Sequence, residues 1–227
     1  MEDYYRLAEF AALLGEPQRA RIVVALMGGT ALPAGELARL SGIAASTASG
    51  HLALLVSGGI LSVERHGRHR YYRISDRNIA AALESLAAML PPQQAKYRSD
   101  ARMRLASART CYDHLAGDLG VRWTEALLAR GVLLDKGLNY QLNPQKVAAL
   151  RAMGFELQDP HRVDAALFGK KCLDCTQRRH HVGGLLGALL ARELFRMEWV
   201  RRTRGDRTLQ VMPRGRAQFQ RHFALSL

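Results

Sequence analysis

The sequence has few cysteines, a deficit of acidic residues and no long apolar run. It contains three cysteines in 227 residues, and 20 Asp and Glu stand against 33 Lys and Arg. No apolar run reaches the roughly 18 residues that a membrane-spanning helix needs. The N-terminal stretch MEDYYRLAEF also lacks the apolar core of a secretory signal. We therefore expect a cytoplasmic protein whose thiols are free, metal-bound or redox-active, rather than a disulfide-bonded secreted domain.

The excess of positive charge favours a polyanionic partner. The formal net charge is +13 and the sequence pI is about 10.4. A protein with such an excess attracts polyanions, nucleic acid first. The charge is uneven, because residues 1–98 carry 11 Lys and Arg against 8 Asp and Glu, whereas residues 99–227 carry 22 against 12.

The first ninety residues predict short helices followed by one hairpin. Apolar spacing and Gly or Pro boundaries place helices within 4–15, 17–28, 33–42 and 44–59. A strand pair follows over 60–74 with a turn at His66-Gly67, and Asp76 can cap a last helix over 77–90. This order describes a winged helix-turn-helix. The stretch PPQQAKYRSD ends it, so we predict domains at 1–95 and 96–227.

Short polar residues at the start of the 44–59 helix, and arginines in the hairpin, are the candidate contacts to DNA. A helix that enters the major groove needs small hydrogen-bonding side chains near its N-terminal end, and a basic hairpin can hold phosphates. Gly50 is expected to pack close to the backbone. The predicted DNA-binding residues are Ser46, Thr47, Ser49, Gly50, His51, Arg65, Arg68, His69 and Arg70.

These stretches resemble the ArsR/SmtB family of bacterial transcriptional repressors. The resemblance rests on LGEPQRARIVVALMGG, GELARLSGIAASTASGHLALLVSGGIL and VERHGRHRYYRI, and covers about residues 5–90. It implies a homodimer whose interface is formed by the first and last helices of this domain. It also implies a palindromic operator DNA, from which an inducer releases the repressor.

The metal sites familiar in that family are missing here. The segment LPAGELARL has no cysteine, the helix DRNIAAALESLAAML has no histidine, and Gly58 stands where one metal-sensing branch has a cysteine. Metal sensing is therefore either absent or located in the second half of the chain.

The second half contains an internal repeat. HLAGDLGVRWTEALLARGVL (114–133) aligns without gaps with HVGGLLGALLARELFRMEWV (181–200), which pairs His114 with His181 and Gly120 with Gly187. We predict a mainly α chain with small antiparallel hairpins. Its C-terminal α+β domain would consist of two wing-like helix-hairpin-helix units, at about 105–160 and 172–227. The stretches ARTCYDHLAGDLG and CLDCTQRRHHVGGLLG also resemble the C-terminal extension of longer ArsR-type regulators.

The cysteines and two histidines lie just ahead of these copies and form a candidate effector site. The candidate metal ligands are Cys111, His114, Cys172, Cys175 and His181. The first four would make a Cys3His set for Zn, Cd or Pb, with His181 as a substitute ligand. Two alternatives remain open, a thiol that senses oxidants or electrophiles and a set of residues that only fills the core.

Other classes of protein have less support. MGGT and GGLLG lack the lysine and the strand of a phosphate-binding loop, and no nucleophile turn is present, so we predict no enzyme. The main alternative is a nonspecific nucleic-acid-binding protein that binds RNA or shapes chromatin. RNA modules usually present stacking aromatic residues on strands, and the hairpin offers only Tyr71 and Tyr72. Five aromatic residues of the second half are expected in the core rather than in a ligand-binding cage, namely Tyr112, Trp123, Tyr140, Phe155 and Trp199.

Overall fold

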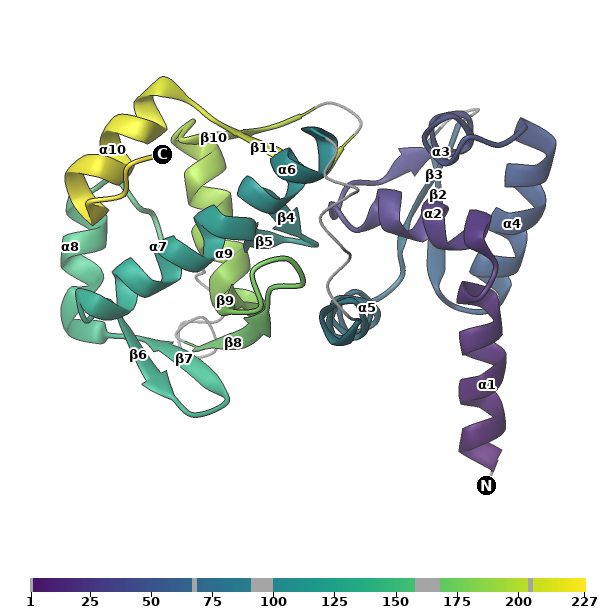
Figure 1. Ribbon diagram of the computed structural model, residues 1–227, viewed down its shortest axis with the longest axis horizontal. Coiled ribbons are helices and arrows are strands. Elements are labelled where there is room, and N and C mark those ends of the chain that lie inside the picture. The colour runs from purple at the N-terminus through teal and green to yellow at the C-terminus, as the bar shows by residue number, and fades with distance from the viewer. Residues whose placement is uncertain (1, 67–68, 91–99, 158–167, 204–205) are drawn as a thin grey trace. The chain divides into compact units, whose positions relative to one another are not determined.

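The computed structural model divides into two compact units, each shown as a ribbon in Figure 1. It describes residues 2–66, 69–90, 100–157, 168–203 and 206–227. Residue contacts separate Met1–Ala82 from Leu83–Leu227, and this division falls inside one helix. The boundary predicted near residue 95 lies outside the described residues.

The first unit has the predicted order of helices and strands. The elements of the winged helix-turn-helix are α1 (Glu2–Leu14), α2 (Pro17–Leu26), β1 (Leu32–Pro33), α3 (Ala34–Ser41), α4 (Ala45–Ser57), β2 (Leu61–His66), β3 (His69–Ile74) and α5 (Arg77–Met89). The strands form one antiparallel sheet in the order β1-β3-β2. Strand β1 was not predicted, because a two-residue strand gives no periodic signal.

Local chemistry fixes the ends of these helices. The Glu16 carboxylate accepts hydrogen bonds from the backbone N–H groups of Gln18 and Arg19 at the start of α2. Gly42 ends α3 with a φ of 68°, a left-handed conformation that favours glycine. Asp76 accepts a 2.6 Å hydrogen bond from the N–H of Asn78, as expected for the cap of α5.

The second unit is α+β. Its helices and strands are α6 (Asp100–Ser107), β4 (Arg109–Cys111), β5 (His114–Ala116), α7 (Gly117–Ala129), β6 (Leu133–Lys136), β7 (Asn139–Leu142), the 3-10 turn η2 (Pro144–Lys146), α8 (Val147–Ala152), β8 (Phe168–Leu173), β9 (His180–Gly183), α9 (Gly184–Arg196), β10 (Val200–Arg202), β11 (Leu209–Val211) and α10 (Pro213–Phe223). Strands β6-β7-β8-β9 form one antiparallel sheet. Hairpins β4-β5 and β10-β11 each form a two-stranded sheet of their own. One isolated β-bridge, between Arg109 and Thr208, connects them.

A group of aromatic rings fills the core of this unit. Trp123 and Trp199 are each 1% exposed, and both contact Phe155, Phe219 and Phe223 with ring centroids 5.2–6.5 Å apart. Burial of this much aromatic surface is a large stabilising contribution. The prediction of core positions is confirmed for Trp123, Tyr140, Phe155 and Trp199, whereas Tyr112 is only half-buried.

Equivalent glycines let α7 and α9 approach the strands before them. A Cβ added at Gly120 would lie 2.7 Å from the carbonyl oxygen of Leu115, and one at Gly187 would lie 2.4 Å from that of Val182. Both distances are shorter than any real contact. No other residue can therefore occupy these positions without moving the helix.

Among the described residues, no single helix has the length and apolar character to cross a membrane. Helices α3 and α4 together reach that length and composition, but they are bent by 107° at the break between them.

We predict that Gly187→Ala destabilises the second unit by about 1–3 kcal/mol, because the added methyl group overpacks α9 against Val182. Tryptophan fluorescence during urea unfolding measures this directly, since Trp123 and Trp199 both lie in this unit. Gly35→Ala in α3 is the control, because a Cβ there meets no atom within 4 Å. Its unfolding is followed by far-UV circular dichroism, since the first unit contains no tryptophan. An equal loss of stability in both variants would refute the packing argument.

Candidate DNA interface and candidate metal centre

Helix α4 has one buried face and one polar exposed face. Ala48, Leu52 and Leu55 are fully buried, at the i, i+4 and i+7 spacing of a helix face. Ser46, Thr47, Ser49 and Gly50 are exposed. The exposed side chains near the N-terminal end of α4 are thus short and polar, as contact with base edges in a major groove requires.

Gly50 and His51, which are also predicted DNA contacts on α4, differ from the exposed serine and threonine side chains. A Cβ added at Gly50 would meet no atom within 4 Å, so the chain itself does not crowd this position and a partner could approach it closely. The His51 side chain is only 16% exposed, and its Nε2 lies 3.1 Å from Oε1 of Gln18 on α2. The structure therefore gives His51 a contact between helices that the sequence did not indicate.

The hairpin β2-β3 carries exposed arginines. Arg65 and Arg70 face each other across the strands, and both are exposed. Arg73 forms an ion pair with Glu64, so the guanidinium of Arg73 is less available for a phosphate contact. Arg68 lies outside the described residues, and so does the side chain of His69.

Four of the predicted metal ligands meet in the second unit. Cys111 lies opposite His114 in the register of hairpin β4-β5, and Cys172 lies opposite His181 in hairpin β8-β9. Each hairpin thus supplies one cysteine and one histidine. Cys111, His114 and His181 are buried and Cys172 is half-buried, and one ligand atom from each lies within 4.8 Å of all the others.

The distances within this Cys/His cluster match a tetrahedral metal site. The Sγ atoms of Cys111 and Cys172 are 3.7 Å apart, and the Nε2 atoms of His114 and His181 are 3.1 Å apart. Usual zinc bond lengths give tetrahedral edges of about 3.8 Å between two sulfurs and about 3.3 Å between two nitrogens. The residues present therefore fit zinc or a similar ion without a large rearrangement.

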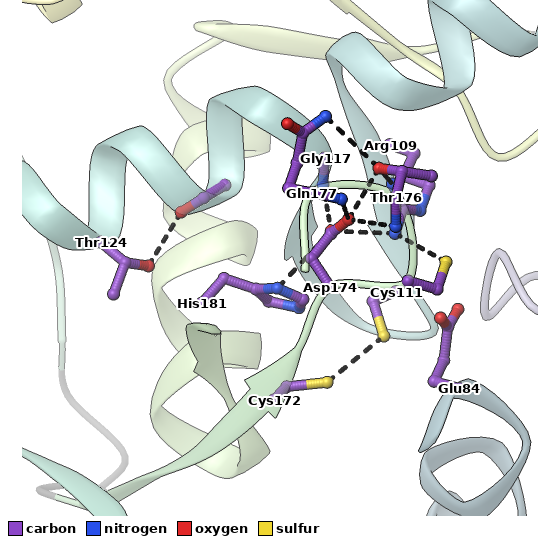
Figure 2. A network of polar contacts seen from close by, with 12 residues as sticks. Glu84, Arg109, Cys111, Gly117, Thr124, Cys172, Asp174, Thr176, Gln177 and His181 are labelled. Atoms are coloured by element: carbon purple, nitrogen blue, oxygen red, sulfur yellow. Dashed lines mark hydrogen bonds and ion pairs between the residues drawn. The ribbon is translucent and has the colours of Figure 1, made fainter. Parts of the chain in front are cut away.

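A carboxylate lies behind each histidine. Nδ1 of His114 is 3.1 Å from Asp113, and Nδ1 of His181 is 3.6 Å from Asp174. Figure 2 shows His181 directed between Asp174 and the sulfur atoms. The Asp113 contact at Nδ1 leaves Nε2 of His114 as the ligand atom, which is the usual arrangement of a metal-binding histidine. Nδ1 of His181 is buried and makes no hydrogen bond to the described residues.

The pKa values of the two cysteine thiols in the cluster are shifted in opposite directions. The hydrogen bond from Cys111, with those from His114 and His181, holds the pKa of Cys172 well below its usual range despite burial. The same Cys111–Cys172 contact, together with burial, raises the pKa of Cys111. Burial lowers the pKa of His114, but Asp113 and the Cys172 sulfur outweigh it and raise that pKa to about 9. This arrangement favours the thiolate form of Cys172, and a bound cation would replace the protons of Cys111 and His114.

The structure does not bring Cys175 into the cluster. Its Sγ atom accepts a 3.2 Å hydrogen bond from Nη2 of Arg109. The Cys3His set expected from the sequence is therefore replaced by two cysteines and two histidines, with His181 in the place given to Cys175. Cys175 lies beyond the end of β8, so it does not share the strand position of Cys172.

Asp174, which belongs to no predicted ligand set, organises the loop beside the cluster. It is fully buried and forms an ion pair with the fully buried Arg109 at 2.9 Å. Its carboxylate also accepts hydrogen bonds from the N–H groups of Gly117, Thr176 and Gln177 (Figure 2). Burial raises the pKa of Asp174, but Arg109 and these hydrogen bonds outweigh it and hold the pKa below its usual range. In the sequence, Asp174 is only a spacer within Cys-x-x-Cys, so nothing marked it.

Comparison with known proteins supports the helix-turn-helix of the first unit, and one relative also matches the second unit. A helix-turn-helix domain model matches residues 14–64. YdfF of Bacillus subtilis, an uncharacterized HTH-type transcriptional regulator, is 35% identical over 223 residues, which cover 97% of this chain and 98% of YdfF. The HTH-type transcriptional regulator CmtR of Mycobacterium tuberculosis is 38% identical over 80 residues, 35% of this chain and 67% of CmtR. The solved structure of the repressor BigR from Xylella fastidiosa is 26% identical, covers 40% of this chain and 93% of BigR, and has a TM-score of 0.37.

These findings define a helix-turn-helix transcriptional regulator. The chain belongs to the ArsR family of such regulators, and the match to YdfF includes its whole C-terminal unit.

We predict that Asp174→Asn destabilises the second unit by about 3–5 kcal/mol, because it leaves the Arg109 guanidinium buried without its counter-charge. Urea unfolding followed by tryptophan fluorescence provides the measurement. Asp118→Asn is the matched control, since its ion pair with Arg122 is partly exposed and should contribute less than about 1 kcal/mol. Equal effects of the two substitutions would contradict the role given to Asp174.

Proposed function

We propose that this chain is a homodimeric repressor that binds a palindromic operator through α4 and the β2-β3 hairpin. The observation that carries the proposal is the exposed polar face of Ser46, Thr47 and Ser49 on a helix whose other face is fixed in the core. A rigid helix with short donors and acceptors suits direct reading of base edges. Exposed Arg65 and Arg70 on the hairpin add contacts to phosphates.

Exposed apolar side chains on α1 and α5 support the homodimer. Tyr5 and Leu7 on α1 are 70% and 61% exposed, and Leu86 and Met89 on α5 are 57% and 78% exposed. Large apolar side chains gathered on one helix usually mark an interaction surface. In the family that this chain belongs to, the first and last helices of the domain are the expected dimer interface.

The rival function is nonspecific binding of nucleic acid. A repressor should bind its operator roughly a thousandfold or more tightly than bulk DNA at physiological salt. A nonspecific RNA-binding or chromatin protein would show no such ratio.

We predict that the double variant Arg65→Ala/Arg70→Ala weakens operator binding and reduces the slope of log affinity against log salt by about 2, because each lost phosphate contact removes about 0.9 from the slope. Fluorescence anisotropy with the protein's own promoter, at several salt concentrations, gives both quantities. Lys136→Ala/Lys146→Ala removes the same charge from exposed positions of the second unit and serves as the control. A slope unchanged from wild type would remove the hairpin from the interface.

We further propose that the Cys/His cluster is the inducer site and that the inducer is a soft divalent cation. Two sulfur and two imidazole ligands favour Zn, Cd or Pb over the hard cations Mg and Ca. The near-tetrahedral spacing favours zinc among these ions. The bound cation would supply the charge that holds the two hairpins together, while the chain's own carboxylates orient the histidines.

We predict that the wild-type chain binds one zinc ion per protomer and that zinc lowers its operator affinity, by the 5–150-fold that is typical of allosteric coupling. Cys172→Ser should lower zinc affinity by more than about 100-fold, since even the loss of an outer hydrogen-bond partner costs about 10–100-fold. Metal-to-protein ratios after gel filtration, and DNA anisotropy with and without zinc, provide the measurements.

Cys175→Ser is the matched control for this experiment, because Cys175 lies outside the cluster. It should bind zinc and respond to it as the wild type does. Loss of zinc in Cys175→Ser but not in Cys172→Ser would overturn the assigned ligand set.

The 3.7 Å contact between Cys111 and Cys172 supports a second candidate inducer, an oxidant such as a peroxide. Two thiols and one hydrogen peroxide would give one disulfide and two water molecules. His181→Ala separates the two candidates, because it removes a metal ligand and leaves both thiols. A DNA response to peroxide that survives in His181→Ala, with no response to zinc in the wild type, would favour the oxidant.

We infer that the second unit arose by duplication of one segment. One order of elements occurs twice along the chain: a strand pair, a helix, a second strand pair and a second helix. The first copy runs from β4 to α8 and the second from β8 to α10. Supporting this inference, Gly120 and Gly187 make the same close approach, and a cysteine lies opposite a histidine in the first hairpin of each copy. On this inference each copy contributes half of the Cys/His cluster.

A further inference from the structure

The last part of the second unit carries a large share of the positive charge of the chain. Residues 192–221 contain nine arginines and no lysine against three acidic residues, so this stretch of 30 residues holds +6 of the net charge of +13. One of the acidic residues, Glu193, is buried and bonded to Arg196. Like charges at this density repel one another, which weakens a fold unless a partner uses them.

Helix α10 presents this charge on one regular face. Gly215, Phe219 and Phe223 recur every four residues and are buried. A Cβ at Gly215 would lie 2.0 Å from the carbonyl oxygen of Trp199, so the helix is held tightly on the core. Arg214 and Arg221 are exposed and seven residues apart, which puts them two turns apart on one side of the helix.

The composition of α10 runs against helix stability. The sequence PRGRAQFQRHF has no acidic residue, and Arg214 and Arg216 stand in the first turn, where the positive end of the helix dipole favours acids. Among the described contacts, Arg216 bonds the carbonyl oxygen of Leu227, while Arg214 and Arg221 have no ion pair. Two exposed guanidinium groups thus lie on one rigid helix, Arg214 in its first turn and Arg221 in its last.

Hairpin β10-β11, which precedes α10, extends the basic surface. Arg201 and Arg202 are exposed at the end of β10, and Arg201 forms a solvent-exposed ion pair with Glu198 at 3.4 Å. The guanidinium of Arg202 lies 4.9 Å from the centre of the Phe195 ring, which helps to fix its position. A rigid helix and a hairpin with fixed arginines are suited to a regular array of phosphates.

We propose that α10 and hairpin β10-β11 form a second DNA-binding surface that contacts the phosphate backbone without reading sequence. This proposal rests on the DNA-binding function proposed above and adds a partner surface to the C-terminal unit. Double-stranded DNA is the polyanion proposed as the partner of the first unit, and its phosphates are the same chemical groups that these arginines suit. The surface would raise affinity for all sequences alike and would increase the salt dependence of binding.

The test compares full-length wild type with Arg214→Gln/Arg221→Gln on operator DNA and on a scrambled duplex of equal length. The variant should lose a slope of about 2 in log affinity against log salt on both duplexes, because two phosphate contacts are removed. Lys136→Gln/Lys146→Gln is the control of equal charge from the same unit and should keep the wild-type slope.

The possible outcomes distinguish a failure of the α10 surface from a failure of the proposed repressor function. If the wild type binds the operator no better than the scrambled duplex, the repressor function fails. If the wild type is specific and the α10 variant keeps its slope, or the lysine control loses as much, the α10 surface is overturned alone. A loss confined to single-stranded RNA of the same length would assign the surface to RNA instead and also overturn it.

Discussion

The buried ion pair between Arg109 and Asp174 is the interaction on which the C-terminal unit depends most. Arg109 lies on β4 and Asp174 just beyond β8, so their contact joins the two hairpins that carry the cysteines and histidines. Asp174 also accepts the N–H of Gly117 at the start of α7 and approaches His181. One carboxylate therefore sets the distance between the hairpins and faces a ring that a metal would bind. Because both charges are fully buried, either one alone would be very costly.

The electrostatics of the Cys/His cluster follow from this arrangement. The hairpins bring two sulfurs and two imidazoles together, and their mutual hydrogen bonds lower the pKa of Cys172 and raise that of His114. A divalent cation would replace mobile protons with one fixed charge at the junction of the hairpins. Metal binding is then linked to the folding of this unit and to pH, since the ligands must lose protons. The proposal that the second unit senses the effector rests on this cluster and on the lack of the family's usual metal ligands in the sequence of the first unit.

The sequence predicted the first unit well because local signals dominate there. Apolar spacing in α4, the glycine after α3 and the cap at Asp76 each act over a few residues, and the structure has all three. The Cys/His cluster was predicted only in part, because its geometry depends on strand register. The Cys-x-x-C spacing pairs Cys172 with Cys175 along the chain, yet the hairpin sets Cys172 opposite His181 and leaves Cys175 with Arg109. Arg109 and Asp174 were missed, because a buried ion pair between distant residues leaves no pattern in a single sequence.

We propose that two cysteines and two histidines, one of each from either hairpin, bind a soft metal ion together. X-ray absorption spectroscopy of the zinc-loaded full-length protein can test this ligand set, because it counts the sulfur and nitrogen atoms around the metal. We expect two sulfurs at about 2.3 Å and two imidazole nitrogens at about 2.0–2.1 Å. Three sulfurs, which would require Cys175, or a shell of oxygen and nitrogen without sulfur, would contradict it.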